Sequence, residues 1–278
     1  MTRVRTITAL VMAPLAIAAI LLLPTEWIMV LAAVLFLMGL WEWFDLAEIE
    51  DGVSRTVLLI AHMALLVAIV WGSRAPTGYT FALFELATVV GVAWWALAAL
   101  WLTRHGFGSD HTRWTRVAKL AAAALAVIPA WCALAWLHAG EPNGPRWLLA
   151  ALMTVWAADT GAYFAGRTLG RTKLAPTISP NKTVEGLVGG IVAGVVVGCA
   201  FGAFAGARGT TLALVALAAF AAGMFSVIGD LFESLLKRHV GVKDSGHLLP
   251  GHGGVLDRID GVLAALPVFA LSKALLGF

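Results

Sequence analysis

The chain has 278 residues, of which 60% are hydrophobic and only 13% are charged, and its net charge is +3. Soluble domains contain about 45–50% apolar and about 25% charged residues, so a water-soluble globular protein is excluded and lipid is the expected solvent. The small net charge gives no reason to expect a nucleic-acid partner.

Nine apolar segments are long enough, or nearly so, to cross a bilayer. Backbone polar groups must pair within the segment in hydrocarbon, so each span is predicted to be a helix and the fold to be an all-α, multi-pass membrane protein. The predicted spans are 7–23, 27–46, 56–72, 80–102, 117–138, 147–166, 184–207, 211–236 and 261–277. We divide the chain into an N-terminal membrane region, 1–138, and a catalytic membrane region, 147–278, with motif loops 166–184 and 237–260.

The positive charges indicate which ends of the spans face the cytoplasm. With a cytoplasmic N-terminus, nine spans place only Arg74, Arg146, Arg208 and Lys273 of the 19 Lys and Arg residues on the outer side. Cytoplasmic loops carry the excess of Lys and Arg in multi-pass proteins. We therefore predict a cytoplasmic N-terminus, a periplasmic C-terminus and location in a bacterial inner membrane.

The seventh span carries glycine at every fourth position from Gly186 to Gly206. Such a row lies on one face of a helix and lets a second helix approach closely, either within the subunit or across a dimer. The regular spacing differs from a phosphate-binding glycine loop at a helix start, so we expect a packing role.

The first polar region lies between the sixth and seventh spans. Pro176 and Pro180 end any helix there, so residues 179–182 are predicted to form a turn into the next helix. Free N–H groups at that helix start, beside Lys182, suit a phosphate or a carboxylate.

Carboxylates inside the predicted spans need an explanation, because charge is costly in a membrane. Asp159 lies near the cytoplasmic end of the sixth span, beside the first motif loop, and is predicted to be functional. The alternative is a structural carboxyl that is neutral or paired with Arg167. Glu42 and Glu85 raise the same question without a motif around them, and we leave both as structural or of unknown role.

The second polar region joins the last two spans. One face of the eighth span carries, at helical spacing, Asp230, Glu233, Ser234 and Lys237. Asp257 and Asp260 are three residues apart, so their carboxylates point the same way if the last helix has begun. Hard oxygen ligands from two helices, close to Lys and Arg, suit Mg²⁺ with a polyphosphate. Glycines in the loop allow a ligand to approach the backbone.

A basic loop that binds anionic lipid headgroups is the simpler interpretation of this region. It explains the lysines and arginines, but not the three aspartates, which weaken such an attraction. His247 and His252 do not have the spacing of a zinc site with Cys or carboxylate ligands.

At these residues the sequence resembles a known family. The pattern Ser234-x2-Lys237-Arg238-x4-Lys243-Asp244-x-Gly246-x2-Leu249-Pro250-x-His252-Gly253-Gly254-x2-Asp257-Arg258-x-Asp260 resembles the signature of the phosphatidate cytidylyltransferases, or CDP-diacylglycerol synthases. The upstream Asp159 with Ser179-Pro180-Asn181-Lys182-Thr183-x-Glu185-Gly186 resembles the second conserved block of that family. Together they cover roughly residues 157–261.

The resemblance implies conversion of CTP and phosphatidate to CDP-diacylglycerol and pyrophosphate by a homodimer. It also implies that the enzyme requires Mg²⁺, with a second, monovalent cation such as K⁺ beside it. By position, Asp230, Asp257 and Asp260 are similar to the metal-binding aspartates of the family. We predict that these three residues, Lys182 and Lys237 form the catalytic group. The predicted substrate-binding residues are Asp159, Arg167, Arg171, Lys173, Ser179, Asn181, Arg238, Lys243, His252, Gly253, Gly254 and Arg258.

Two other functions would fit part of the pattern. A CTP-dependent kinase for a polyprenol or similar lipid alcohol would share the membrane setting, but it would release CDP. An ion-coupled transporter would need paired, broken helices in two repeated halves, and the polar motifs gather in the C-terminal half only.

Overall fold

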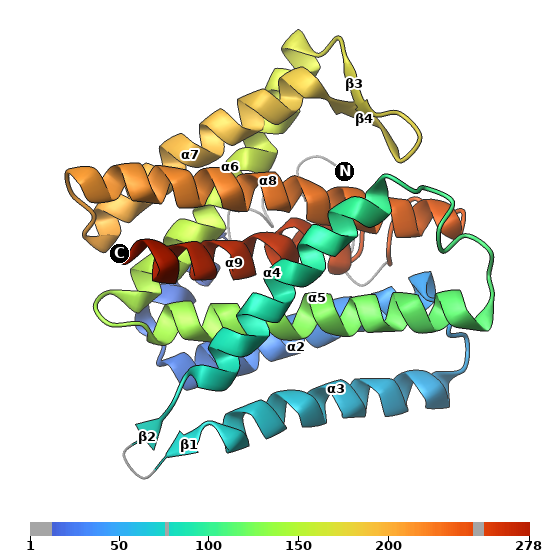
Figure 1. The fold of residues 1–278 in the computed structure, drawn as a ribbon, viewed down its shortest axis with the longest axis horizontal. Coiled ribbons are helices and arrows are strands. Elements are labelled where there is room, and N and C mark those ends of the chain that lie inside the picture. The colour runs from blue at the N-terminus through green and yellow to red at the C-terminus, as the bar shows by residue number, and fades with distance from the viewer. Residues whose placement is uncertain (1–12, 76–77, 247–252) are drawn as a thin grey trace.

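The computed structural model describes residues 13–75, 78–246 and 253–278. Within these residues, eight helices are long and apolar enough to cross a bilayer, and a shorter apolar helix, Ala13–Leu22, precedes them (Figure 1). The long helices are α2 (Thr25–Leu46), α3 (Gly52–Gly72), α4 (Ala82–Leu102), α5 (Arg113–Ala139), α6 (Gly144–Leu169), α7 (Val184–Ala205), α8 (Thr210–His239) and α9 (Leu256–Leu276). The all-α, multi-pass prediction is confirmed, although the first predicted span begins outside the described residues.

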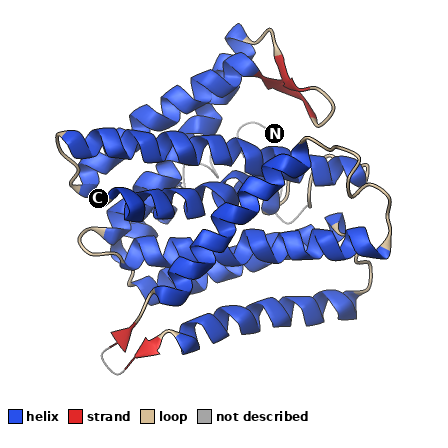
Figure 2. Ribbon diagram, viewed as in Figure 1, coloured by secondary structure: helices blue, strands red, loops and turns tan. Residues whose placement is uncertain are grey.

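Two short β-hairpins join helices (Figure 2). The first pairs β1 (Arg74–Ala75) with β2 (Gly78–Tyr79), and the second pairs β3 (Lys173–Ala175) with β4 (Ser179–Thr183), both antiparallel. The second hairpin corrects the prediction of a turn over 179–182. A proline can occupy an edge strand because its fixed φ suits extended backbone and its missing N–H is not needed there.

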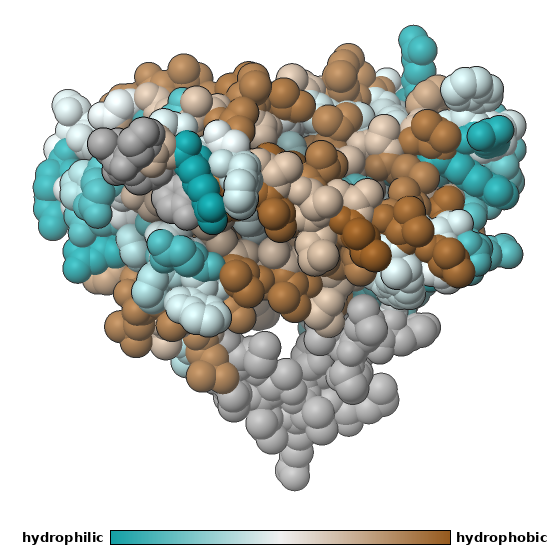
Figure 3. Space-filling view, turned by 90° about the horizontal axis from the view of Figure 1, so that it is seen from below, coloured by the Kyte–Doolittle hydropathy of each residue, from teal (hydrophilic) through white to brown (hydrophobic). Residues whose placement is uncertain are grey.

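The helices form a bundle whose middle is apolar on the outside as well as the inside. In the space-filling view, brown apolar side chains cover the middle of the face and teal polar ones gather toward its two ends (Figure 3). Helix α3 lies at the edge of the bundle and has only His62 and Leu66 buried (Figure 1). An apolar outer surface that faces lipid explains why the chain is too hydrophobic for a soluble protein.

The connections between helices separate into two groups at opposite ends of the bundle (Figure 1). At one end, the His239 ring nitrogen Nε2 lies 2.8 Å from the carbonyl oxygen of His105. At the same end, the Nζ atom of buried Lys119 lies 3.3 Å from Oε2 of Glu48. At the other end, the guanidinium of Arg146 lies 4.8 Å from the Phe204 ring centroid. The predicted cytoplasmic loops therefore share one end. Which side of the membrane that end faces stays a prediction.

The glycine row of α7 packs against α6 within the chain. A Cβ on Gly190 would lie 2.6 Å from the carbonyl oxygen of Ala158, and one on Gly194 would lie 3.0 Å from that of Thr154. Larger side chains would force the two helices apart. The predicted packing role is confirmed, while Gly206 lies beyond the helix and caps it in the left-handed conformation, at φ 115°.

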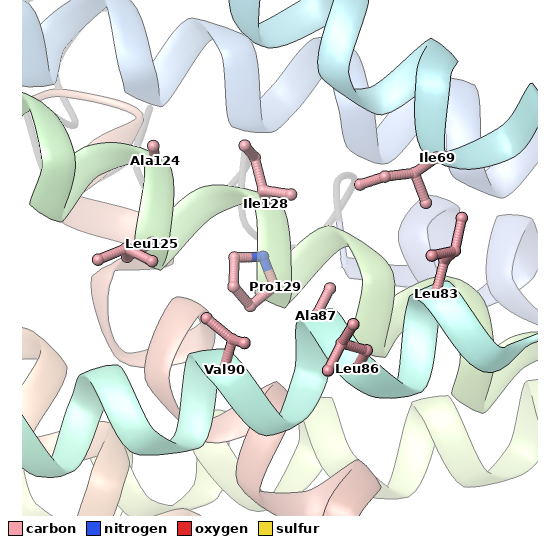
Figure 4. Close-up of a pocket in the computed structure, with 9 residues that line it drawn as sticks. All are labelled: Ile69, Leu83, Leu86, Ala87, Val90, Ala124, Leu125, Ile128 and Pro129. Carbon is pink, nitrogen blue, oxygen red and sulfur yellow. The ribbon is translucent and has the colours of Figure 1, made fainter. Parts of the chain in front are cut away.

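One cavity, of about 290 Å³, opens between α3, α4 and α5 (Figure 4). All the residues that line it are apolar: Ile69, Leu83, Leu86, Ala87, Val90, Ala124, Leu125, Ile128 and Pro129. A cavity without a polar side chain cannot neutralise phosphate charge, so the candidate site must be sought where charged residues converge.

Candidate functional site

Helices α8 and α9 cross closely where their acidic residues lie. A Cβ on Gly229 would be 2.4 Å from the carbonyl oxygen of Asp260, and a Cβ on Gly261 would be 2.6 Å from the Ser226 hydroxyl. Both distances are shorter than van der Waals contact, so these positions need glycine. The crossing brings Asp230 and Asp260 close enough for their charges to interact.

A buried ion-pair group lies beside this crossing. The Lys237 ammonium is 2.7 Å from Glu233 Oε2 and 2.6 Å from Asp257 Oδ1. Glu233 is 2% exposed and Lys237 is 8% exposed. Burial of the Glu233 carboxylate is costly, and the lysine that it shares with half-buried Asp257 offsets that cost. Lys237 therefore connects α8 to the first turn of α9.

Asp257 also closes the motif loop. Its Oδ2 accepts hydrogen bonds from the backbone N–H groups of Ser245, at 3.1 Å, and Gly254, at 2.9 Å. The last helix begins at Leu256, so Asp257 and Asp260 both lie near its start, as expected. Their surroundings nevertheless differ: Asp257 holds the loop, whereas Asp260 accepts a hydrogen bond from the backbone N–H of Gly261 at 2.6 Å.

The hairpin brings Lys182 to the same crossing. Lys182 lies in β4 and forms an ion pair with Asp230 Oδ2. The hairpin is anchored by Arg238, whose Nε donates to the carbonyl oxygen of Ile178 at 3.1 Å. Asp159 of α6 interacts electrostatically with both Asp230 and Lys182. The two motif regions, which are far apart in sequence, thus meet in one place.

The other predicted site residues lie around this group or outside it. Arg167 donates to the Tyr163 hydroxyl at 3.0 Å, so the alternative pairing with Asp159 is not formed. Gly253 has φ 81°, in the left-handed region that favours glycine. The remaining residues of the hairpin and of the motif loop lie at the protein surface, except Ser179, which is half-buried: Arg171, Lys173, Ser179, Asn181, Lys243 and Arg258. His252 lies outside the described residues.

The chemistry of the donor set, although not its present arrangement, suits a hard divalent cation. Five carboxylates, namely Asp159, Asp230, Glu233, Asp257 and Asp260, share the crossing with two lysines, Lys182 and Lys237. The buried Oε1 of Glu233 has no hydrogen-bond partner among the described residues. Carboxylate oxygens are the preferred ligands of Mg²⁺. In the described part of the chain, however, no three Asp, Glu, His or Cys side chains converge as a metal site. Lysines lie against three of the carboxylates instead.

The sequence left the role of Glu42 open, and the structure shows its partners. Its carboxylate accepts hydrogen bonds from the backbone N–H groups of Val255, at 3.0 Å, and Leu256, at 2.8 Å. The Ser245 hydroxyl donates a third at 3.0 Å. The only sequence signal was a carboxylate within an apolar span, which does not reveal a partner more than 200 residues away.

Comparisons with known proteins identify the family of the chain. The sequence profile of the cytidylyltransferase family matches residues 3–276. A Pseudomonas aeruginosa protein named phosphatidate cytidylyltransferase is 38% identical over 275 residues, covering 97% of this chain and 96% of the relative. A protein of that name from Haemophilus influenzae is 33% identical over 283 residues, covering 97% of this chain and 98% of the relative. A protein of the same name from Brucella suis is 46% identical over 142 residues, covering 51% of this chain and 52% of the relative. The chain belongs to the cytidylyltransferase family.

Proposed function

We propose that the protein is a phosphatidate cytidylyltransferase, which converts CTP and phosphatidate to CDP-diacylglycerol and pyrophosphate. The observation that carries the proposal is the meeting of both motif regions in one charged group at one end of a membrane-spanning bundle. That place allows water-soluble CTP to reach a lipid phosphate that stays in the bilayer. The names of the full-length relatives support the same reaction.

The chemistry needs charge neutralisation more than proton transfer. A phosphate oxygen of phosphatidate attacks the α-phosphorus of CTP, and the bond from that phosphorus to the bridging oxygen of the β-phosphate breaks. Pyrophosphate leaves with the electron pair. The nucleophile is already anionic near pH 7, so the main obstacle is to bring two anions together. Positioning and electrostatic stabilisation are the remedies that a protein can supply.

Lys182 and Lys237 are the residues best placed to neutralise phosphate. Each already contacts carboxylates at the crossing, and each can exchange such a contact for a phosphate oxygen. Arg238 and Lys243 lie exposed at the end of α8 and in the loop that follows, where they would attract or bind the incoming anions. The exposed charges of the hairpin would act in the same way.

We propose that Asp230, Asp257 and Asp260 hold Mg²⁺, with Asp159 as a further ligand or as a partner of Lys182. The ion would neutralise charge on the CTP phosphates and on the leaving pyrophosphate. The formal excess of carboxylates over lysines supports binding of cations. A second, monovalent cation such as K⁺ rests on the family resemblance, as does a homodimer. We place the enzyme in a bacterial inner membrane with its site facing the cytoplasm.

The proposal is tested by Asp257→Asn in purified protein. The variant keeps the size of the side chain but removes a charge that contacts Lys237, and CDP-lipid formation should fall at least 100-fold, as it does when a main electrostatic group is lost. Glu50→Gln, which removes a charge from an exposed loop residue, is the matched control and should keep parental activity. Near-normal turnover by a folded Asp257→Asn variant would contradict the metal and site assignment.

A further inference from the structure

Glu42 lies in α2, in the N-terminal region, whereas every residue of the candidate site comes after residue 158. The side chain is only 2% exposed and its two carboxylate oxygens accept three hydrogen bonds. Oε1 accepts from Val255 N–H, and Oε2 accepts from Leu256 N–H and the Ser245 hydroxyl. A buried carboxylate with this many partners has a defined structural task.

The task is to cap α9. The residue at the N-cap position of this helix is Val255, which has no side-chain acceptor for the free N–H groups of the first turn. Such groups need acceptors, and a negative charge near a helix N-terminus is favoured by the helix dipole. Glu42, which precedes Val255 by 213 residues, supplies both the acceptor oxygens and the negative charge.

The motif loop is shaped to admit this carboxylate. A Cβ on Gly246 would lie 2.4 Å from Glu42 Oε1, and a Cβ on Gly254 would lie 2.4 Å from Glu42 Oε2. Neither glycine could be replaced without displacing Glu42 or the loop. Gly254 thus makes room for a protein side chain, in addition to the substrate contact that was predicted for it.

Ser245 links the cap to the reacting groups. Its hydroxyl donates to Glu42 and its backbone N–H donates to Asp257, whose other oxygen contacts Lys237. We infer that Glu42 is a positioning residue of the site: it holds the start of α9, and thereby sets the place of Asp257 and Asp260. The kinetic part of this inference rests on the proposed cytidylyltransferase function.

The first test compares Glu42→Gln with Glu42→Asp. Gln replaces one acceptor oxygen by an NH₂ group that faces an N–H or O–H donor, so at least one of the three hydrogen bonds is lost. The Asp variant keeps the charge on a shorter side chain. Glu85→Gln, the same change at an exposed residue of α4, is the matched control.

We expect Glu42→Gln to lower kcat at least tenfold and to raise the Mg²⁺ concentration for half-maximal rate at least threefold. Glu42→Asp should recover part of the lost kcat and part of the change in the Mg²⁺ requirement. Glu85→Gln should match the parent in both quantities. A general loss of folded protein would lower the apparent kcat without changing the Mg²⁺ requirement. A kcat within twofold of the parent, or a loss of kcat that leaves the Mg²⁺ requirement unchanged, would overturn the inference.

A second measurement is independent of activity. Hydrogen–deuterium exchange of peptides that cover residues 253–260 should be faster in Glu42→Gln than in the parent, while peptides from α6 and α7 should be unchanged. If the parent makes no CDP-lipid, the proposed function fails, and this exchange measurement alone decides whether Glu42 holds α9. Unchanged exchange at the start of α9 would refute the positioning role in either case.

Discussion

The buried contacts of Lys237 allow a sharp test of how structure and catalysis are combined at the helix crossing. Lys237→Met keeps a long apolar side chain but leaves the carboxylates of Glu233 and Asp257 without the cation that lies 2.7 and 2.6 Å away. Loss of one partner of a buried ion pair costs about 3–5 kcal/mol. For a chain of this size that corresponds to a fall of roughly 6–20 °C in the unfolding midpoint.

The double variant Lys237→Met/Glu233→Gln separates the two roles of the lysine. Removing the buried charge of Glu233 should restore most of the lost stability, because Asp257 keeps its two backbone N–H donors. Activity should stay at least 100-fold below the parent, since the cation proposed to neutralise phosphate is still missing. Thermal unfolding in detergent and CDP-lipid formation are measured on the same samples.

Lys273→Met is the matched control for this prediction. Lys273 lies at the opposite end of the bundle, with its ammonium 5.2 Å from the Trp147 ring centroid, and its loss should leave activity unchanged. The reasoning would be refuted if Lys237→Met kept the parental midpoint. If the double variant regained parental activity, Lys237 would have only a structural role.

Three further outcomes are expected. Lys182→Ala should raise the KM for CTP about tenfold or more, since a hydrogen bond to a charged group contributes about 1.5–3 kcal/mol; an unchanged KM in steady-state kinetics would remove Lys182 from the phosphate site. Gly194→Val should cost about 1–3 kcal/mol by forcing α7 from α6, and parental heat stability would contradict the close packing. Although burial opposes it, hydrogen bonds from His111 and Lys119 lower the pKa of Glu48 below its ordinary 4.5. The folded state therefore gains stability above pH 4.5 and loses it as the pH falls through the lowered pKa. Glu48→Gln should accordingly lower the unfolding midpoint more at pH 7 than at pH 3. If the substitution lowered the midpoint by the same amount at both pH values, the contact would be refuted.

The sequence was most informative where the solvent dictates the structure. Apolar segments of about 20 residues in a bilayer must be helices, and the predicted span 211–236 corresponds to α8, Thr210–His239. The helical spacing of Asp230, Glu233 and Lys237 correctly placed them on one face. The regular glycine row likewise predicted close packing, because its spacing alone puts the glycines on one side of a helix.

The sequence was least informative where the partner is distant. Pro180 was correctly interpreted as excluding a helix, but a five-residue edge strand has no periodicity long enough to distinguish it from a turn. Nothing near Glu42 shows that it caps a helix more than 200 residues later. Likewise, the residue spacing of Asp257 and Asp260 could not reveal that the Asp257 carboxylate holds the motif loop and the Asp260 carboxylate does not.

The most direct test of the proposed function is to identify the products of the purified protein with phosphatidate, Mg²⁺ and each of CTP, UTP, ATP and GTP. CTP alone should give CDP-diacylglycerol and pyrophosphate in equal amounts, and neither should form when phosphatidate or Mg²⁺ is omitted. Release of CDP with a phosphorylated lipid, or no CDP-lipid from any nucleotide by folded protein, would contradict the cytidylyltransferase function.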